Sequence, residues 1–163
     1  MLIDDARGTL AALREFIKEE RKAKSGLDLN VGDIVYQNLD RDDGLVLTGD
    51  YDTRLKYFVI VGKNESGDLL GICLINSDLD FYKKKPQRQK YQYVMKQGDY
   101  PDILEKDSRL DCTTFLKIDV AKSVDVEAEI VGHLTEDDKK YVFQLIADCG
   151  FISKHDKKVF NII

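Results

Sequence analysis

The sequence predicts an α+β fold that is mainly β, a small barrel or curled sheet with a helix at each end of the chain. Short runs of β-branched and aromatic residues, bounded by turn residues, fill the middle of the sequence. Apolar residues at helical spacing occur near the two ends. Strands and helices do not alternate, so a parallel α/β sheet is not expected.

The first element is expected to be a helix over residues 2–24. Its apolar residues recur at spacings of three and four and share one face: Ile3, Ala6, Leu10, Leu13 and Ile17. A Ser-Gly pair ends this segment, so residues 1–26 are expected to be a helical extension and residues 27–163 the barrel domain. The apolar face is expected to dock on the barrel. Because the spacing is also a two-heptad pattern, self-association is the alternative.

Six stretches have the composition of strands. They are Asp33–Leu39, Leu55–Gly62, Leu69–Asn76, Tyr91–Met95, Thr113–Val120 and Val126–Val131. Between the second and third, Asn64–Asp68 contains a glycine that suits a hairpin loop.

A second helix is expected over Glu136–Cys149. Thr135 suits the N-cap, and Asp138 stands three residues later, as in a capping box. Gly150 stands where a helix-ending glycine belongs. The expected buried stripe consists of Tyr141, Val142, Leu145, Ile146 and Cys149. The tail, Val159–Ile163, is expected to add an edge strand.

Composition limits the class of protein. The chain has 163 residues, the length of one domain, and 43% of them are hydrophobic. It has no apolar run of about 18 residues, so no membrane span is expected, and its first residues do not resemble a signal peptide. Three cysteines without CxxC spacing favour reduced thiols in the cytoplasm. With a net charge of −5, any contact with nucleic acid must use a local basic patch.

Two stretches resemble the MazF/PemK toxin family. Residues 31–36 (VGDIVY) and, after a loop, 53–61 (TRLKYFVIV) are similar to the family's G-D-[IV]-V strand and its T-R-P-V-V-V-type strand. Residues 104–112 (LEKDSRLDC) and 130–138 (IVGHLTEDD) are similar to its D-S strand and the I-G-x-L-[ST]-x-[ED]-[ED] turn that opens its last helix. Together the motifs cover most of residues 31–150.

The resemblance implies an SH3-like β-barrel that forms a homodimer and works as a toxin of a type II toxin–antitoxin system. Such a protein cleaves single-stranded RNA without a metal or cofactor and is neutralised by an antitoxin. The family places a catalytic arginine at the start of its second long strand and a threonine or serine at the end of its third. Arg54 and Ser77 occupy these positions here.

The chain also departs from the family pattern. Leu55 replaces the proline after the arginine, and the loop over residues 41–52 lacks the polar triplet of the family. Residues 114–116 (TFL) replace a Q-[IV]-[RK] segment. The alternative function is therefore a catalytically degenerate barrel that binds protein or nucleic acid without cutting it.

The two candidate catalytic residues suit metal-free cleavage of RNA. The reaction needs a base for the 2′-OH, positive charge for the phosphorane and a proton for the leaving 5′-oxygen. The guanidinium of Arg54 matches a phosphate and stays charged; the alternative is a surface arginine paired with Asp52. The Ser77 hydroxyl can donate to a phosphate oxygen; the alternative is an ordinary role in the turn.

A basic stretch with tyrosines follows the third strand. It can follow a phosphate backbone and stack bases, or it can be a solvated loop. The candidate RNA-binding residues are Lys83, Lys84, Lys85, Arg88, Lys90 and Tyr91.

The general base is left open. His133 is expected in a tight turn and His155 in a solvated tail, so neither is a strong candidate. Asp107 or Asp52 could serve if its pKa were raised. The histidines and acids do not have the spacing of metal ligands, so no metal is expected.

Overall fold

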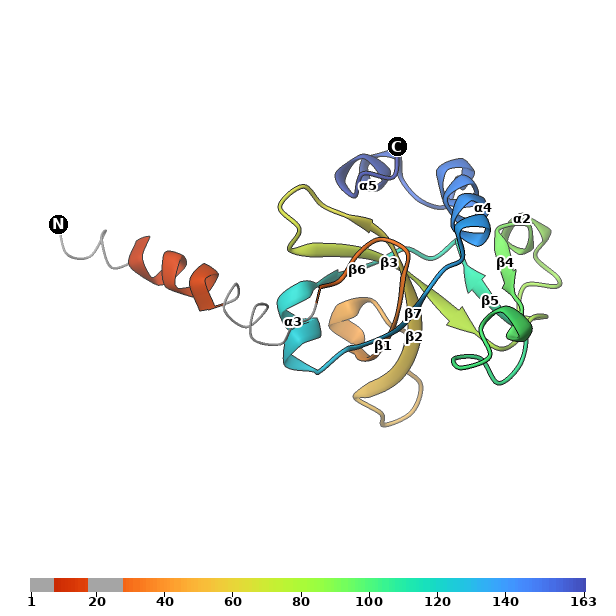
Figure 1. Cartoon of the computed structure of the whole chain (residues 1–163), viewed down its shortest axis with the longest axis horizontal. Helices are drawn as coiled ribbons and strands as arrows, with labels where there is room; N and C mark the ends of the chain where they lie inside the picture. The colour runs from red at the N-terminus through yellow and green to blue at the C-terminus, as the bar shows by residue number, and fades with distance from the viewer. Residues whose placement is uncertain (1–7, 18–27) are drawn as a thin grey trace.

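The structure is a computed structural model that describes residues 8–17 and 28–163 (Figure 1). Strands dominate the described part, and all their pairings are antiparallel. The strands are β1 (Asp33–Asp40), β2 (Thr53–Lys63), β3 (Leu69–Asn76), β4 (Gln92–Met95), β5 (Ser108–Asp111), β6 (Leu116–Asp119) and β7 (Glu129–His133). With helices toward both ends, this is the α+β, mainly β fold that the sequence predicts.

Strand β3 organises the sheet. The strands follow the order β4-β5-β3-β2-β1-β7, and β6 also pairs with β3. The first half of β3 pairs with β6, whereas Ile75 and Asn76 at its end pair with β5. Because two strands share one edge of β3, the sheet curls there. Among the described strands, β4 does not pair with β7, so the curled sheet remains open at these two edges.

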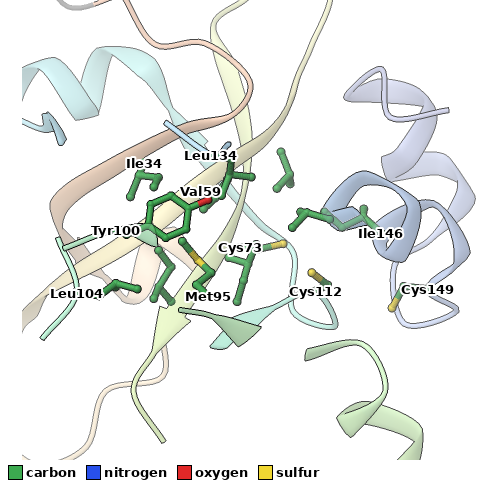
Figure 2. Packing of buried hydrophobic residues seen from close by; sticks show 14 of the residues in the cluster. Ile34, Val59, Cys73, Met95, Tyr100, Leu104, Cys112, Leu134, Ile146 and Cys149 are labelled. Carbon is green, nitrogen blue, oxygen red and sulfur yellow. The ribbon is translucent and has the colours of Figure 1, made fainter. Parts of the chain in front are cut away.

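Both faces of the central strands are buried. Along β2, Val59 and Val61 belong to one hydrophobic cluster, whereas Phe58 and Ile60 belong to the other. Alternate side chains of a strand point to opposite faces. Because both faces are buried here, the middle of β2 (YFVIV) is a continuous apolar run. Figure 2 shows part of the first cluster, which fills the space between the sheet and the long helix α4.

Besides the helical residues 8–17, residues 28–163 carry four helices, of which three are short and α4 is the long one. They are α2 (Pro86–Gln89), α3 (Val120–Asp125), α4 (Glu136–Asp148) and α5 (Lys154–Val159), and the 3-10 turns are η1 (Arg41–Asp43) and η2 (Gln97–Asp99). The expected start of α4 is confirmed, because the Thr135 side chain accepts a hydrogen bond from the Asp138 backbone N–H. The expected stripe is only partly right: Val142 and Ile146 are buried, but Tyr141 is 66% exposed.

The prediction of an edge strand over Val159–Ile163 is wrong. The preceding residues form α5, which Ser153 caps by accepting a hydrogen bond from the Asp156 backbone N–H. Buried Phe160 then packs edge-on against Phe115. The Ser-x-x-Asp pattern that starts α5 is a capping signal that the sequence interpretation passed over. The short helices α2 and α3 were not expected either.

The strand expected over Thr113–Val120 is shorter and lies at Leu116–Asp119. Thr113 is instead part of a turn, where its N–H and hydroxyl donate to the Asp111 carboxylate. The strand ends at Asp119 because the side chain of this residue caps α3. His133 lies in β7 and not in a tight turn.

Residues 8–17 are helical, as expected. Every one of these residues is exposed, including Leu10, Leu13 and Phe16, so the expected docking on the barrel is not observed for this stretch. The remaining helix positions and the domain boundary after residue 26 lie outside the described residues.

The three cysteines are free thiols, as expected, and all three are buried. Burial raises the pKa of Cys73 and Cys112, so these thiols are protonated and unreactive at neutral pH. Within the described residues, no helix has the length and apolar character needed to cross a bilayer.

Gly71 tests the packing of the curled sheet. A Cβ at this position in β3 would lie 2.1 Å from the Phe115 ring, so the ring has to move. We expect Gly71→Ala to lower the free energy of unfolding by about 1–3 kcal/mol, measured by urea denaturation. Gly98→Ala is the control, because nothing lies within 4 Å of its added Cβ. A Gly71→Ala variant as stable as the wild type would contradict this packing.

Candidate functional site

A cleft of about 670 Å³ opens where β2, β3 and β5 meet the loops that follow β3 and precede β5. Its basic lining residues are Arg54, Lys56, Lys106 and Arg109, and its acidic ones are Asp78, Glu105 and Asp111. Tyrosine, phenylalanine and leucine side chains complete the walls. The cleft therefore combines charged and aromatic surface.

Strand register aligns three polar side chains across the cleft. Lys56 in β2 lies opposite Asn76 in β3, and its Nζ donates a hydrogen bond of 2.7 Å to the Asn76 Oδ1. Asn76 is paired in turn with Arg109 in β5. Directly opposed residues in antiparallel strands share a face, so Lys56, Asn76 and Arg109 form a row over three strands.

Arg109 is buried and fixed on several sides. Its Nε donates to the Asp78 carbonyl oxygen at 2.6 Å, and its Nη1 donates to the Gln92 Oε1 at 2.7 Å. The guanidinium carbon lies 5.0 Å from the ring centre of Phe81 and 5.1 Å from that of Tyr82. This one side chain therefore ties the loop after β3 to strands β4 and β5.

Asp111 is the negative partner of this arginine, at 4.0 Å from its Nη1. The carboxylate accepts hydrogen bonds from the Thr113 hydroxyl and backbone N–H and from the Gln92 side chain. Burial alone would raise the pKa of Asp111, but these hydrogen bonds outweigh it, so the pKa lies below its ordinary value. Asp111 is thus held in its charged form.

The structure brings Arg54 and Ser77 to the same cleft, and both are exposed there. In residues 8–17 and 28–163, no carboxylate forms an ion pair with Arg54, so the alternative pairing with Asp52 is not observed. The catalytic roles of Arg54 and Ser77 stay predictions.

Lys56 is half-buried and lies near two other cations. Partial burial lowers the pKa of its amine, and the positive charges of Arg54 and Arg109 lower it further. An anion bound among these three cations would relieve their repulsion and favour the ammonium form. The electrostatics of the cleft therefore suit a negatively charged ligand.

The basic stretch lies outside the cleft, because none of its six candidate residues is part of the lining. Arg88 donates to the Thr113 hydroxyl and lies over the Phe151 ring. The Tyr91 hydroxyl donates to the Asp148 carbonyl oxygen, and the Lys90 amine lies over the Tyr91 ring. These three residues therefore have structural contacts.

Lys83, Lys84 and Lys85 are exposed just before α2, in the segment that follows the cleft residues Phe81 and Tyr82. They are the part of the basic stretch that lies closest in sequence to the lining residues of the cleft.

The acid–base candidates do not line the cleft. His133 pairs through its Nδ1 with the buried Asp33 at 2.5 Å, and His155 is exposed on α5. Asp107 accepts a hydrogen bond from the Gln97 backbone N–H, and Asp52 is exposed. Among the residues that the structure describes, no group of three or more His, Cys, Asp or Glu is arranged to hold a metal ion.

The sequence interpretation missed Lys56, Asn76 and Arg109. A signal was present for Lys56, because it directly precedes the apolar run YFVIV of its strand. Charged groups inside such segments are costly to bury without a partner. Arg109 gave no such signal, because its strand (SRLD) has Leu110 as its one apolar residue. The sequence did not show that the two charges face each other across Asn76, because that depends on long-range strand pairing.

Comparison with known proteins supports the fold. No protein-family model matches the chain, and no curated protein is detectably similar in sequence. Among solved structures, the chain is similar to one from "Crystal structure of MazE-MazF (Form-III) from Deinococcus radiodurans", with a TM-score of 0.50 and 12% identity. The match covers 76% of this chain and 97% of that chain. The likeness is one of fold, and it agrees with the MazF-like fold expected from the motifs.

Asp111 makes the stability of the cleft depend on pH. Its pKa is lowered by folding, so its contribution is present above the unfolded pKa of about 3.9 and is lost as the pH falls below that value. We expect Asp111→Asn to be less stable than wild type by about 1–3 kcal/mol at pH 7. In urea denaturation, this difference should shrink as the pH falls below ~4, because the unfolded chain takes up a proton at this carboxyl before the folded chain does, and wild type loses the stability that the lowered pKa provides.

The control for this variant is Asp50→Asn, at an exposed loop position. A difference between Asp111→Asn and wild type that stays constant from pH 7 to pH ~3 would contradict the role given to the Asp111 charge.

Proposed function

We propose that the protein is a MazF-like endoribonuclease that cuts single-stranded RNA at this cleft without a metal. One observation carries the proposal: Arg54, Lys56 and Arg109 converge on one cleft beside the exposed hydroxyl of Ser77. In the described part of the chain, neither Arg54 nor Lys56 has a carboxylate partner within ion-pair distance. Such a cluster attracts an anion, and arginine matches a phosphodiester.

The aromatic lining supports a single strand as the ligand. Tyr36 and Tyr57 stack with ring centres 4.4 Å apart, and both line the cleft together with the exposed Phe81. Aromatic rings beside cations bind unpaired bases by stacking while the cations hold the phosphates. The bases of a duplex are already stacked on each other, so a single strand fits this surface better.

The proposed chemistry is transfer of the phosphodiester to the neighbouring 2′-oxygen. The 2′-oxygen attacks phosphorus, the bond to the 5′-oxygen breaks, and the products are a 2′,3′-cyclic phosphate and a free 5′-hydroxyl. Arg54 stabilises the charge of the phosphorane, and Ser77 donates a hydrogen bond to a phosphate oxygen. Lys83, Lys84 and Lys85 hold the strand where it leaves the cleft.

The proposal includes an inhibitory partner protein and a homodimer. The structural neighbour comes from a MazE–MazF crystal structure, and the motif resemblance implies an antitoxin. Exposed apolar side chains beside the charges, including Val46, Leu55 and Phe81, offer a protein partner apolar surface at the same cleft.

A second candidate function is a binding module on the same fold that does not cut. The observation that favours it is the lack of an evident base: no histidine is part of the cleft lining, and Asp111 is held in its charged form by hydrogen bonds within the protein. Such a module would bind RNA or protein through the same cations.

Arg54→Ala separates the two functions. With a long single-stranded RNA in EDTA, we expect wild type to cut and Arg54→Ala to cut about 10²–10³-fold more slowly, because one phosphorane-stabilising group is lost. Ser77→Ala should show a smaller loss, on the order of 10-fold. Cleavage is followed by gel electrophoresis of end-labelled RNA.

Arg41→Ala is the matched control, since this exposed arginine in η1 is not part of the cleft lining. If wild type and Arg54→Ala leave the RNA equally intact while wild type still binds it, the nuclease proposal fails and the binding module is supported.

The lysines before α2 give a second test, on binding. Replacing Lys83, Lys84 and Lys85 by alanine should raise KM and leave kcat unchanged, because these residues lie outside the cleft. The slope of log affinity against log salt should fall by about 2, at about 0.7 for each lost phosphate contact on a single strand.

The control replaces three exposed lysines of α4 and α5, namely Lys140, Lys154 and Lys158. Equal salt slopes for the two triple variants would remove the lysines before α2 from the RNA-binding surface.

A further inference from the structure

Breaking the bond between phosphorus and the 5′-oxygen requires a proton for the leaving oxygen. Histidine is the usual donor, but no histidine lines the cleft. We propose that Lys56 supplies this proton and so acts as the general acid of the reaction. This inference rests on the proposed function and assigns a role that the sequence left open.

The position of Lys56 supports the assignment. It lies two residues beyond Arg54 on β2, so the two side chains share a face of the strand. The hydrogen bond to Asn76 fixes its amine in the row that leads to Arg109. An ammonium has three N–H donors, and Asn76 is the acceptor found for one of them. The amine thus lies within electrostatic reach of both guanidiniums and has donors left for a ligand.

The surroundings of Lys56 make it the cleft's best proton donor. Arginine does not release a proton in proteins, so Arg54 and Arg109 can supply charge only. Lys106 is exposed, whereas Lys56 is half-buried. Burial and the two guanidiniums lower the pKa of Lys56, which makes its proton easier to transfer.

The carboxylates of the cleft oppose this lowering of the Lys56 pKa. Asp78, Glu105 and Asp111 also line the cleft, and their negative charge favours the ammonium form of Lys56. Asp111 is engaged with Arg109. The pKa of Lys56 is nevertheless lowered, so burial and the cations outweigh the carboxylates.

The 2′-OH loses its proton to a solvent base, and the 2′-oxygen forms its bond to phosphorus. The bond to the 5′-oxygen breaks and leaves its electron pair on that oxygen, which takes a proton from the Lys56 ammonium. The neutral amine regains a proton from water before the next turnover.

A substrate with sulfur at the leaving position tests this role. The probe is a DNA oligonucleotide with one ribonucleotide, followed by a linkage in which sulfur replaces the bridging 5′-oxygen. A thiolate leaves without a proton, so a missing general acid no longer matters for this substrate. The matched oxygen substrate needs the acid.

Lys56→Ala and Lys56→Arg should cut the oxygen substrate about 10²-fold or more slowly than wild type. On the sulfur substrate, Lys56→Arg should approach the wild-type rate to within about threefold, since the proton is not needed. Lys56→Ala, which also removes a positive charge from the cleft, should recover only in part. Lys56→Arg keeps the positive charge but cannot give up its proton. Recovery of its cleavage rate on the sulfur substrate therefore distinguishes a loss of proton transfer from a loss of charge.

Two control variants show how the loss of a positive charge affects the cleavage rates when the proton donor is kept. Arg54→Ala should slow both substrates, because the phosphorane carries its charge in either case. Lys106→Ala removes a cation from the same cleft and should affect the two substrates alike. Thermal unfolding of each variant checks that it is folded.

The pH profile gives an independent readout. Wild-type cleavage of the oxygen substrate should decline at alkaline pH as Lys56 loses its proton, and the decline should begin below the ordinary lysine pKa. Lys56→Arg should not show this decline.

Equal impairment of Lys56→Arg on both substrates would overturn the general-acid role while leaving the nuclease intact. A wild-type protein that cuts neither substrate in EDTA would instead overturn the proposed function, and the role of Lys56 with it.

Discussion

The buried guanidinium of Arg109 is the interaction on which the cleft depends. Taking a charged group out of water is expensive unless hydrogen bonds and an opposite charge replace the solvent. Arg109 has the Asp78 carbonyl, the Gln92 side chain and Asp111 around it, with two aromatic rings at its sides. These partners come from β4, β5 and the loop after β3. The charge therefore adds a polar link to segments that also share the first hydrophobic cluster, through Met95 of β4 and Leu110 of β5.

The same charge defines the chemistry of the cleft. Asn76 links Arg109 by strand pairing to Lys56, and Arg54 follows on the same face of β2. Like charges gathered in this way disfavour one another, which a purely structural site would avoid. Clusters with perturbed protonation are typical of functional sites. A bound phosphodiester would convert the repulsion into attraction, and this is the physical reason for proposing RNA as the ligand of the cleft.

The helices α4 and α5 show which features can be predicted from local sequence patterns and which cannot. The Thr135 cap and the apolar spacing after it were enough to predict α4. The same type of cap at Ser153 was passed over because the apolar tail after it suggested a strand. Phe160 in that tail is buried, but against Phe115 and not at a sheet edge. Apolar character indicates burial, whereas the backbone that achieves it depends on the neighbours available.

The sequence by itself determined the long strands β1, β2 and β3 and the helix α4, because their side-chain periodicity and boundary residues are local properties. Motif order pointed to the MazF-like fold, and the positions of Arg54 and Ser77 followed from it. Only the tertiary structure decided that Lys56, Asn76 and Arg109 form a row, and that the Lys83–Lys85 stretch lies outside the cleft. Which strands pair, and in what register, depends on contacts between residues far apart in the chain, so a local pattern does not contain that information.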